Sequence, residues 1–340
     1  MGDTGADGLP RARDGRVLSV RGFGAGQPSD IPTEEIPCPC CGGKDFTPEA
    51  EGRDFEYATS WQTWRFCRCS ACQCLFLNPR PKLDQFARIY PPWYYSLGGE
   101  GGGFVDAVWR FLQRRKARSY LRLTGKKSGR ALDVGCGDGR FLASVARAAG
   151  KIWRCEGVEV GENGGRAARK AGITVHAGLV EDLPLERGSY DLVWMQQVIE
   201  HVPFPPKTLA RVQELLAPGG TLILETPDLG GWDARLFRRR YWGGYHFPRH
   251  FVLWDRAGLR KIVEGAGLKV TRQRALLSPV FWAFSMRNRA IDKRASKVCA
   301  KWWSASNPLV MAEATWIDLW QSKLFGNSSN QQLVARKDGG

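Results

Sequence analysis

The sequence of 340 residues is long enough for one domain of ordinary size with one or two small appendages. Its hydrophobic fraction of 43% and charged fraction of 25% are those of a globular protein and exclude a disordered or fibrous chain. A net charge of +16 favours anionic partners, such as nucleic acid, anionic lipid or phosphorylated compounds, without selecting among them.

The first part of the chain predicts neither a fold nor a targeting signal. Residues 1–35 are rich in Gly, Asp, Arg and Pro and lack apolar periodicity, which predicts a flexible tail. No apolar run there resembles a signal peptide, and no later segment reaches the roughly 18 apolar residues of a membrane span. We therefore expect a cytoplasmic protein.

Residues 36–80 hold seven of the ten cysteines. Two C-x-x-C pairs, Cys38 with Cys41 and Cys69 with Cys72, are separated by a segment long enough for a hairpin. Two such pairs supply the four thiolates of a tetrahedral zinc site, and in a reducing compartment this spacing indicates metal ligation more than disulfides. We predict one structural zinc ion with no open position for a reacting water, and hence no catalytic part for it.

Three cysteines of the same segment, Cys40, Cys67 and Cys74, exceed the four that one zinc ion needs. Buried free thiols behave as small apolar side chains, and we predict that role for these three. Because they stand so close to the pairs, the ligand set could shift by a residue or two.

Residues 81–128 begin as a loop and continue as a helix. Apolar side chains recur at helical spacings over 104–122, with many arginines between them. The apolar positions are Phe104, Val105, Val108, Phe111 and Leu112. The pattern predicts a basic amphipathic helix.

Residues 129–275 alternate short apolar runs with polar segments of helical character. The apolar runs are residues 131–135, 155–160, 190–195 and 221–227. Strands that alternate with helices form βαβ units, so we predict a doubly wound α/β domain with a mostly parallel sheet.

Residues 276–340 predict an appendage and a last strand. Strands are expected at 268–275 and at 331–337, and a tryptophan-rich helical insertion separates them. Its tryptophans are Trp282, Trp302, Trp303, Trp316 and Trp320.

A glycine-rich turn follows the first strand of the α/β region. Residues 131–142 pass from a buried strand through Gly135, Gly137 and Gly139 into a helix. Glycines let the backbone bend sharply and approach a ligand, and the helix start offers free amides. A dinucleotide fold requires G-x-G-x-x-G, but Arg140 occupies the place of the third glycine. The spacing points away from a pyrophosphate and toward the amino-acid end of S-adenosylmethionine (SAM).

The region 129–275 resembles the class I SAM-dependent methyltransferases. The segments that carry the resemblance follow one another in the family's order: the glycine turn, GVEVGENG, AGLVEDLPL, YDLVWMQQVIEHVPFP, LLAPGGTLILETPD and PRHFVLWDRAGLRKIVEGAGLKV. The resemblance implies a seven-stranded sheet and SAM as cofactor, with Glu159 on the ribose hydroxyls, where charge-assisted hydrogen bonds are strong. The cysteine segment resembles zinc ribbons that precede some bacterial enzymes of this family, although Gln73 stands where a glycine is usual.

The resemblance also assigns the remaining contacts of the cofactor. The cofactor-binding residues it implies are Asp133, Gly135, Cys136, Gly137, Gly139, Glu159, Val160, Leu179, Val180, Glu181, Gln196 and Gln197. The acid often found near adenine is replaced by Leu179, so Glu181, Asp182 or backbone amides alone would serve.

Candidate catalytic residues lie in segments that the family brings toward the active site. They are Glu200, His201, His246 and His250. Methyl transfer from a sulfonium is an in-line displacement, so the enzyme must align the acceptor and, for a hydroxyl, take its proton. A histidine suits the second task; we favour His201, with His250 as the alternative.

The EHVP segment resembles that of ubiquinone-pathway O-methyltransferases, in which an acid one turn earlier can join a Glu-His pair around a divalent ion. That position is Gln197 here, so a catalytic metal is not expected. Amino methylation of bases is disfavoured because MQQVIEH is unlike an NPPY loop, and pyrimidine C5 methylation needs a nucleophilic cysteine in a suitable motif.

Three functions remain. The first is O-methylation, or alternatively C-methylation, of a sugar, glycolipid or other small metabolite, as in bacterial glycan and secondary-metabolite pathways. The second is an RNA methyltransferase that binds RNA through its ribbon and basic surface. The third is a SAM-binding scaffold without catalysis.

The basic helix at 104–122 and the insertion at about 276–326 are predicted to form a lid over an amphiphilic acceptor at an anionic membrane surface. Peripheral contact with the inner face of the membrane would follow. The alternative is that Trp316 and Trp320, one helical turn apart, are core residues that pack an appended helix.

Overall fold

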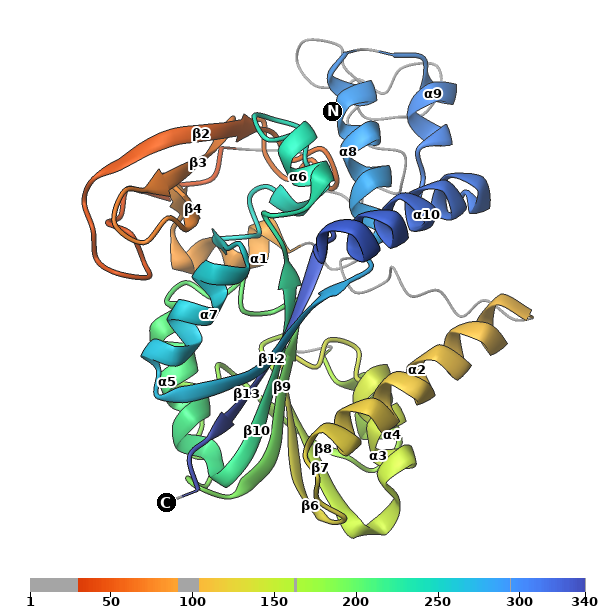
Figure 1. Ribbon diagram of the computed structural model, residues 1–340. Helices are drawn as coiled ribbons and strands as arrows, with labels where there is room; N and C mark the ends of the chain where they lie inside the picture. The colour runs from red at the N-terminus through yellow and green to blue at the C-terminus, as the bar shows by residue number, and fades with distance from the viewer. Residues whose placement is uncertain (1–29, 91–103, 162–163, 294, 340) are drawn as a thin grey trace.

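The computed structural model describes residues 30–90, 104–161, 164–293 and 295–339 (Figure 1). Most of the tail predicted for residues 1–35 lies outside these residues, as do the side chains of Phe104, Val105 and Val108. None of the helices within the described ranges is both long and apolar enough to cross a membrane.

A seven-stranded sheet forms the centre of the molecule. Its order is β12-β13-β10-β9-β6-β7-β8, and only β13 runs antiparallel to its neighbours. The strands are β6 (Gly129–Val134), β7 (Trp153–Glu159), β8 (Thr174–Ala177), β9 (Tyr190–Gln196), β10 (Leu216–Pro227), β12 (Leu268–Leu276) and β13 (Asn330–Lys337). The doubly wound, mostly parallel sheet that we predicted is confirmed.

Helices cover both faces of the sheet. On β9, Leu192 and Trp194 pack into one apolar cluster, while Val193 and Met195 pack into another on the opposite face. The first face carries α2 (Phe104–Leu123), α3 (Arg140–Ala149) and α4 (Arg166–Lys170). The second face carries α5 (Pro205–Leu215) and α7 (Arg256–Gly265), and a short helix η3 (Gly150–Ile152) leads into β7 (Figure 1).

The predicted basic helix is present as α2. Ala117 and Tyr120 are buried against the sheet and α3, whereas Phe111 and Leu112 are 58% and 54% exposed. The apolar stripe that includes Phe111 and Leu112 is therefore not the side of α2 that packs on the sheet.

The ribbon segment forms its own small sheet, attached to the main body. Its strands are β2 (Phe46–Gly52), β3 (Trp64–Cys69) and β4 (Leu75–Leu77), in the order β11-β4-β3-β2. The fourth strand, β11 (Val252–Leu253), belongs to the later part of the chain. Beside it lie β1 (Thr33–Glu34), β5 (Arg80–Pro81), η1 (Leu83–Gln85) and α1 (Phe86–Ile89). A fully buried ion pair between Arg249 and Asp54, 2.8 Å from Nη2 to Oδ2, joins the two parts.

The helical insertion lies between β12 and β13, as predicted. It consists of α8 (Pro279–Asp292), α9 (Lys297–Trp302) and α10 (Pro308–Phe325), next to α6 (Trp232–Leu236) and η4 (Gly243–Tyr245) (Figure 1). Trp316 and Trp320 are 62% and 48% exposed, so the alternative that they are core residues is wrong.

Candidate functional site

The glycine turn after β6 has a backbone that side chains would obstruct. Gly135, Gly137 and Gly139 have φ values of +73°, +56° and +82°. A Cβ at Gly135 would lie 2.5 Å from Val198, and one at Gly139 would lie 2.7 Å from the backbone nitrogen of Ala168. Only glycine tolerates both the conformation and the approach, so the turn stays open at the start of α3.

Glu159 ends β7 beside this turn. Its carboxylate accepts hydrogen bonds from the backbone N–H groups of Gly137 at 2.7 Å, Val160 at 3.0 Å and Gly161 at 3.4 Å. These bonds hold the carboxylate beside the glycine turn. Asp133 lies buried beneath the turn, and burial raises the pKa of its carboxyl well above the usual value.

The other residues expected near adenine differ in how far their side chains are exposed. Val160 and Leu179 are 57% and 37% exposed, whereas Val180 is buried. The Glu181 carboxylate accepts a hydrogen bond from the Thr208 hydroxyl on α5, which holds it toward that helix. Exposed apolar side chains at Val160 and Leu179 could flank a planar base.

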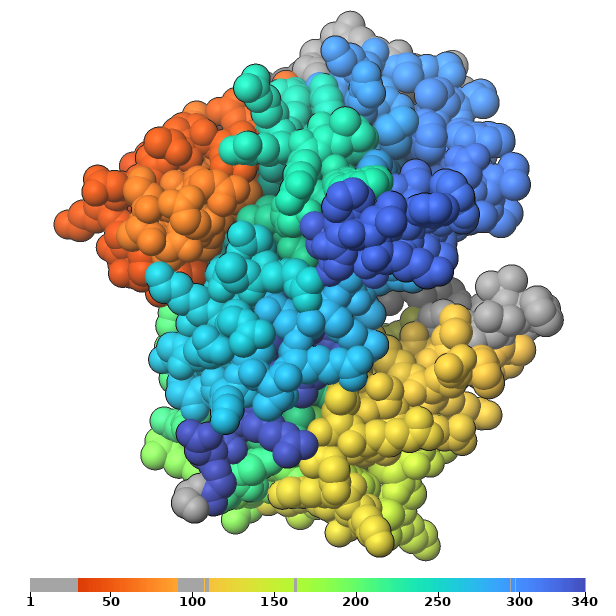
Figure 2. Space-filling model, viewed as in Figure 1, coloured from red at the N-terminus to blue at the C-terminus, as the bar shows by residue number. Residues whose placement is uncertain are grey.

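A cavity of about 620 Å³ opens at the carboxyl ends of β9 and β10, between α2, β12 and α8. In the space-filling view, the surface is hollowed between α2 and the helices of the insertion (Figure 2). Gln196 and Gln197, predicted as cofactor contacts, line this cavity. In open α/β sheets, ligands bind at this edge.

One wall of the cavity is a hydrogen-bonded network around Glu225 that the sequence analysis missed. The Glu225 carboxylate accepts from Lys116 at 2.5 Å, Tyr120 at 2.7 Å and Gln332 at 2.8 Å. Lys116 also donates to the Gln196 side-chain oxygen at 3.1 Å. These residues come from α2, β9, β10 and β13, so no local pattern announces them.

The structure brings the three predicted histidines together near the ribbon. The ring of His250 lies 4.5 Å from that of His201 and 5.0 Å from that of His246, centroid to centroid. His246 Nδ1 lies 2.9 Å from a carboxylate oxygen of Glu56, a ribbon residue. The histidines are not among the residues that line the cavity. His201 lies on the loop between β9 and α5, four residues after Gln197, which does line the cavity.

A backbone carbonyl fixes the tautomer of the His250 ring. Its Nδ1 lies 2.7 Å from the Gly244 carbonyl oxygen, which only accepts, so Nδ1 carries the proton and Nε2 keeps a lone pair. His201 Nδ1 lies 2.8 Å from the Tyr90 hydroxyl, which can donate or accept, and 3.0 Å from the Arg249 carbonyl oxygen. Burial, aided by His246, lowers the pKa of His201 to about 3, so its ring is neutral at physiological pH.

Glu200 is fully buried next to these rings. Its Oε2 accepts from the Thr226 hydroxyl at 3.0 Å, Oε1 has no partner among the described residues, and burial raises its pKa to about 8. Glu200, His201 and His250 each offer a ligand atom within 4.8 Å of the others, so this group could hold a divalent ion. Gln197, in the place of the expected acid, belongs to the cavity instead.

The four predicted zinc ligands converge at one end of the ribbon. Cys38, Cys41, Cys69 and Cys72 have sulfur atoms within 4.8 Å of one another. Cys74 lies 3.4 Å from both Cys38 and Cys72, sulfur to sulfur, so the alternative ligand set remains open.

Both C-x-x-C pairs are followed by a residue with a left-handed backbone. Gly42 and Gln73 have φ values of +74° and +62°, the left-handed conformation that favours glycine. Gln73, which departs from the usual glycine, therefore occupies a strained position. A Cβ at Gly43 would lie 3.3 Å from the sulfurs of Cys41 and Cys69, so the chain there approaches the thiol cluster closely.

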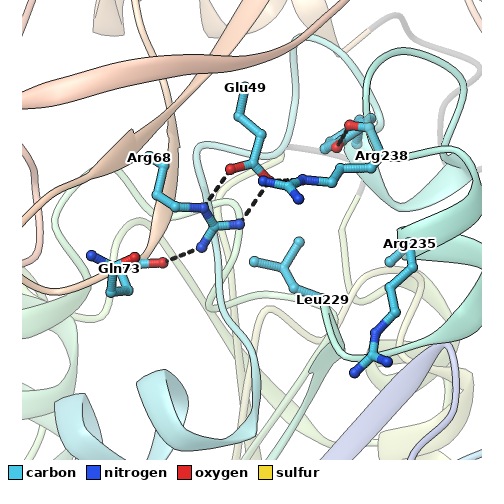
Figure 3. Close-up of a pocket in the computed structure, with 8 residues that line it drawn as sticks. Glu49, Arg68, Gln73, Leu229, Arg235 and Arg238 are labelled. Carbon is cyan, nitrogen blue, oxygen red and sulfur yellow. Dashed lines mark hydrogen bonds and ion pairs between the residues drawn. The ribbon is translucent and has the colours of Figure 1, made fainter.

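A second cavity, of about 390 Å³, lies between the ribbon and α6 (Figure 3). Glu49 accepts from Arg68 and from Arg238, and Arg68 also donates to the Gln73 carbonyl at 2.7 Å. Arg235 points away from this group (Figure 3). Because Glu49 on the ribbon binds both Arg68 of the ribbon and Arg238 after α6, this group joins the ribbon to the main body.

Comparisons with known proteins identify the family. A family model described as a methyltransferase domain matches residues 108–273. A ubiquinone biosynthesis O-methyltransferase from Xanthomonas euvesicatoria pv. vesicatoria is 36% identical over 222 residues, which cover 58% of this chain and 88% of that protein.

Other relatives match over shorter stretches. A 37.1 kDa protein in transposon TN4556 of Streptomyces fradiae is 34% identical, over 35% of this chain and 36% of that protein. A tRNA U34 carboxymethyltransferase from Desulfotalea psychrophila is 31% identical, over 44% and 48%. The matches thus span about a third to a half of these two proteins.

Among solved structures, this chain aligns with the 1,6-didemethyltoxoflavin-N1-methyltransferase of Burkholderia thailandensis, which was crystallised with S-adenosylhomocysteine. The alignment has a TM-score of 0.48 and 15% sequence identity, and it covers 81% of this chain and 96% of that protein. The sequence relationship to the ubiquinone-pathway enzyme decides the assignment, because it extends over most of that protein. This chain belongs to the class I SAM-dependent methyltransferases.

Proposed function

We propose that the protein transfers the methyl group of SAM to an oxygen, or alternatively a carbon, of a small metabolite such as a sugar or glycolipid. The observation that carries the proposal is the β9–α5 loop, which supplies Gln196 and Gln197 to the cavity and Glu200 and His201 to the histidine cluster. One loop thus links the cofactor edge of the sheet to a potential proton acceptor.

We propose that the cofactor binds at the glycine turn and Glu159. Its methionine end would lie over the turn from Gly135 to Gly139, where the start of α3 offers backbone amides. Its ribose would bind Glu159, and its adenine would lie against Val160 and Leu179. His201 is proposed as the base that takes the acceptor's proton, with His250 as the alternative.

Replacing Glu159 with alanine should weaken SAM binding. The variant loses one or two charge-assisted hydrogen bonds to the ribose, worth roughly 1.5 to 3 kcal/mol each. Calorimetry with SAM measures the change. Glu186→Ala removes a side chain that is 71% exposed and far along the sequence from the turn, and serves as the matched control. Unchanged SAM affinity in Glu159→Ala would remove Glu159 from the site.

The acceptor class is tested by incubating the protein with isotopically labelled SAM and separate pools of small metabolites, lipid-linked glycans and RNA. Label in a small molecule or glycan supports the proposal. Label in RNA supports the second candidate, which the ribbon, the charge of +16 and the relative named as a tRNA enzyme favour. SAM binding without transfer to any pool would favour a scaffold.

We also propose peripheral contact with an anionic membrane through the last two helices. Large apolar side chains are exposed along them: Val298, Trp302, Leu309, Trp316, Leu319, Trp320, Leu324 and Phe325. The rings of Trp316 and Trp320 lie 5.4 Å apart, centroid to centroid, and tryptophan is favoured at the membrane interface. The exposed cations Lys301 and Lys323 lie on the same helices and would meet anionic headgroups.

Flotation with anionic liposomes tests this contact. The wild-type protein should float at low salt and be released as salt rises, because screening weakens attraction between exposed charges. Trp316→Ser combined with Trp320→Ser should lower the bound fraction severalfold. Ile152→Ser is the control, since Ile152 is 64% exposed on η3, at the opposite end of the sheet. Absence of binding at every ionic strength would exclude the contact.

A further inference from the structure

The cavity between α2, β12 and α8 has an unequal supply of hydrogen-bond donors and acceptors. Three cationic side chains line it, Arg115 and Lys116 from α2 and Arg274 from β12, against a single acid, Glu225. Glu225 is already neutralised by Lys116, at 2.5 Å, and accepts two further hydrogen bonds. The charge that remains in the cavity wall is therefore positive.

The two arginines have few acceptors of their own. Arg274 donates from Nε to the Gln332 side-chain oxygen at 2.8 Å, and no acceptor for its two terminal nitrogens lies among the described residues. Arg115 lies against the ring of Phe111, and the described part of the chain gives its guanidinium no carboxylate. Each guanidinium has five N–H donors in a fork that matches the oxygens of a phosphate or carboxylate.

A third donor points the same way. The side-chain oxygen of Gln196 accepts a hydrogen bond from Lys116, whereas its Nε2 is buried and has no acceptor among the described residues. A buried donor without a partner is costly unless a ligand supplies the acceptor. The wall facing these donors is apolar; it is formed by Leu276, Leu277, Val280 and Phe281.

We infer that the methyl acceptor carries an anionic group, a phosphate or a carboxylate, which binds Arg115 and Arg274 while an apolar part lies against β12 and α8. This inference rests on the proposed methyl transfer, since the anion belongs to the acceptor. It narrows the acceptor class from small metabolites in general to acidic ones. It also accounts for Arg115 and Arg274 in a cavity whose lining acid, Glu225, is already paired with Lys116.

Calorimetry on protein saturated with S-adenosylhomocysteine tests the inference with two probes, inorganic pyrophosphate and citrate. Saturation fills the cofactor site, so a probe that binds must occupy another position. Arg274→Gln and Arg115→Gln should each weaken binding of the preferred probe about tenfold or more, because each removes charge-assisted hydrogen bonds. Preference for pyrophosphate assigns a phosphate, and preference for citrate assigns a carboxylate.

Two neighbouring arginines provide matched controls. Arg272 precedes Arg274 on β12 and Arg114 precedes Arg115 on α2; both are exposed and neither lines the cavity. Arg272→Gln and Arg114→Gln should leave probe binding within about twofold, since their guanidinium groups remain in solvent.

The inference would be overturned if neither probe binds, or if the control variants weaken probe binding as much as Arg274→Gln and Arg115→Gln do. It would also be overturned if Arg274→Gln lowers the affinity for S-adenosylhomocysteine, because the cations would then bind the cofactor's own carboxylate. Failure of the proposed function is recognised separately. It would appear as absence of methyl transfer to every pool, whatever the probes do.

Discussion

Replacement of His201 by alanine is expected to lower kcat by roughly 10²- to 10⁴-fold while SAM affinity stays nearly unchanged, as for loss of a general base. The physical reason is that the His201 ring, whose Nδ1 lies 3.0 Å from the Arg249 carbonyl oxygen, is neutral, so one of its two ring nitrogens keeps a lone pair that can take a proton. The measurement compares single-turnover methyl transfer with calorimetric SAM affinity in the same variant.

The chain offers two comparisons for this variant. His176 lies on β8, bound to Glu156 at 3.1 Å and outside the cluster, so His176→Ala should leave kcat within a few-fold. His250→Ala tests the alternative base, because its Nδ1 is held by a carbonyl. A drop in SAM affinity at unchanged turnover would give His201 a binding role, and His250 would then be the base.

The pH dependence should depart from that of an ordinary imidazole. The pKa of His201 is lowered to about 3, so the ring stays neutral and its lone pair free as pH falls from 8 to 5. We expect no loss of rate centred near pH 6.5 over that interval. If the rate instead falls as the pH drops through about 6.5, and this fall is absent in His201→Ala, the ring titrates normally in the complex with its acceptor.

Sequence patterns predicted those parts of the fold and of the site whose residues lie close together in the sequence. The alternation on β9 and the glycine spacing after β6 each reflect one strand or one turn, and both follow from backbone geometry. The cysteine pairs are likewise local. These features predicted the sheet, the cofactor turn and the ribbon.

The cavity could not be predicted in this way. Glu225, Lys116 and Gln332 are more than 100 residues apart in sequence, and their contact depends on how α2 and β13 pack against β10. Lys116 looked like one of many cations on a basic helix. The side of α2 that packs on the sheet is equally hard to recognise from the sequence, since Ala117 is less conspicuous than Phe111 in a hydrophobicity pattern.

Removal of zinc is expected to unfold the ribbon and to reduce methyl transfer as well, although the ion takes no part in the chemistry. We predict one zinc ion per chain in reduced protein, bound by Cys38, Cys41, Cys69 and Cys72. Apparent zinc-binding free energies in small fingers are about 10 to 16 kcal/mol, far more than so small a sheet gains from packing alone. Elemental analysis without stoichiometric zinc would contradict the site.

Cysteine variants separate the two ligand sets. Cys41→Ser should lose the ion and lower the melting temperature, whereas Cys299→Ser, at an exposed position outside the ribbon, should change neither. Cys74→Ser should retain zinc if Cys72 is the fourth ligand. Loss of the ion in Cys74→Ser, with retention in Cys72→Ser, would assign the fourth position to Cys74, whose sulfur lies beside the same cluster.

The effect on methyl transfer follows from how the ribbon meets the histidine segment. Asp54 forms the buried ion pair with Arg249, and Glu56 lies 2.9 Å from His246. β4 also pairs with β11, two residues after His250, so an unfolded ribbon removes the partner of His246 and the strand that positions the segment carrying His250. Breaking a buried ion pair by removing one partner typically costs about 3 to 5 kcal/mol, because the other charge is left uncompensated. Chelation should therefore lower kcat while SAM affinity at the glycine turn is kept. Equal loss of both would mean that the whole domain unfolds with the ribbon.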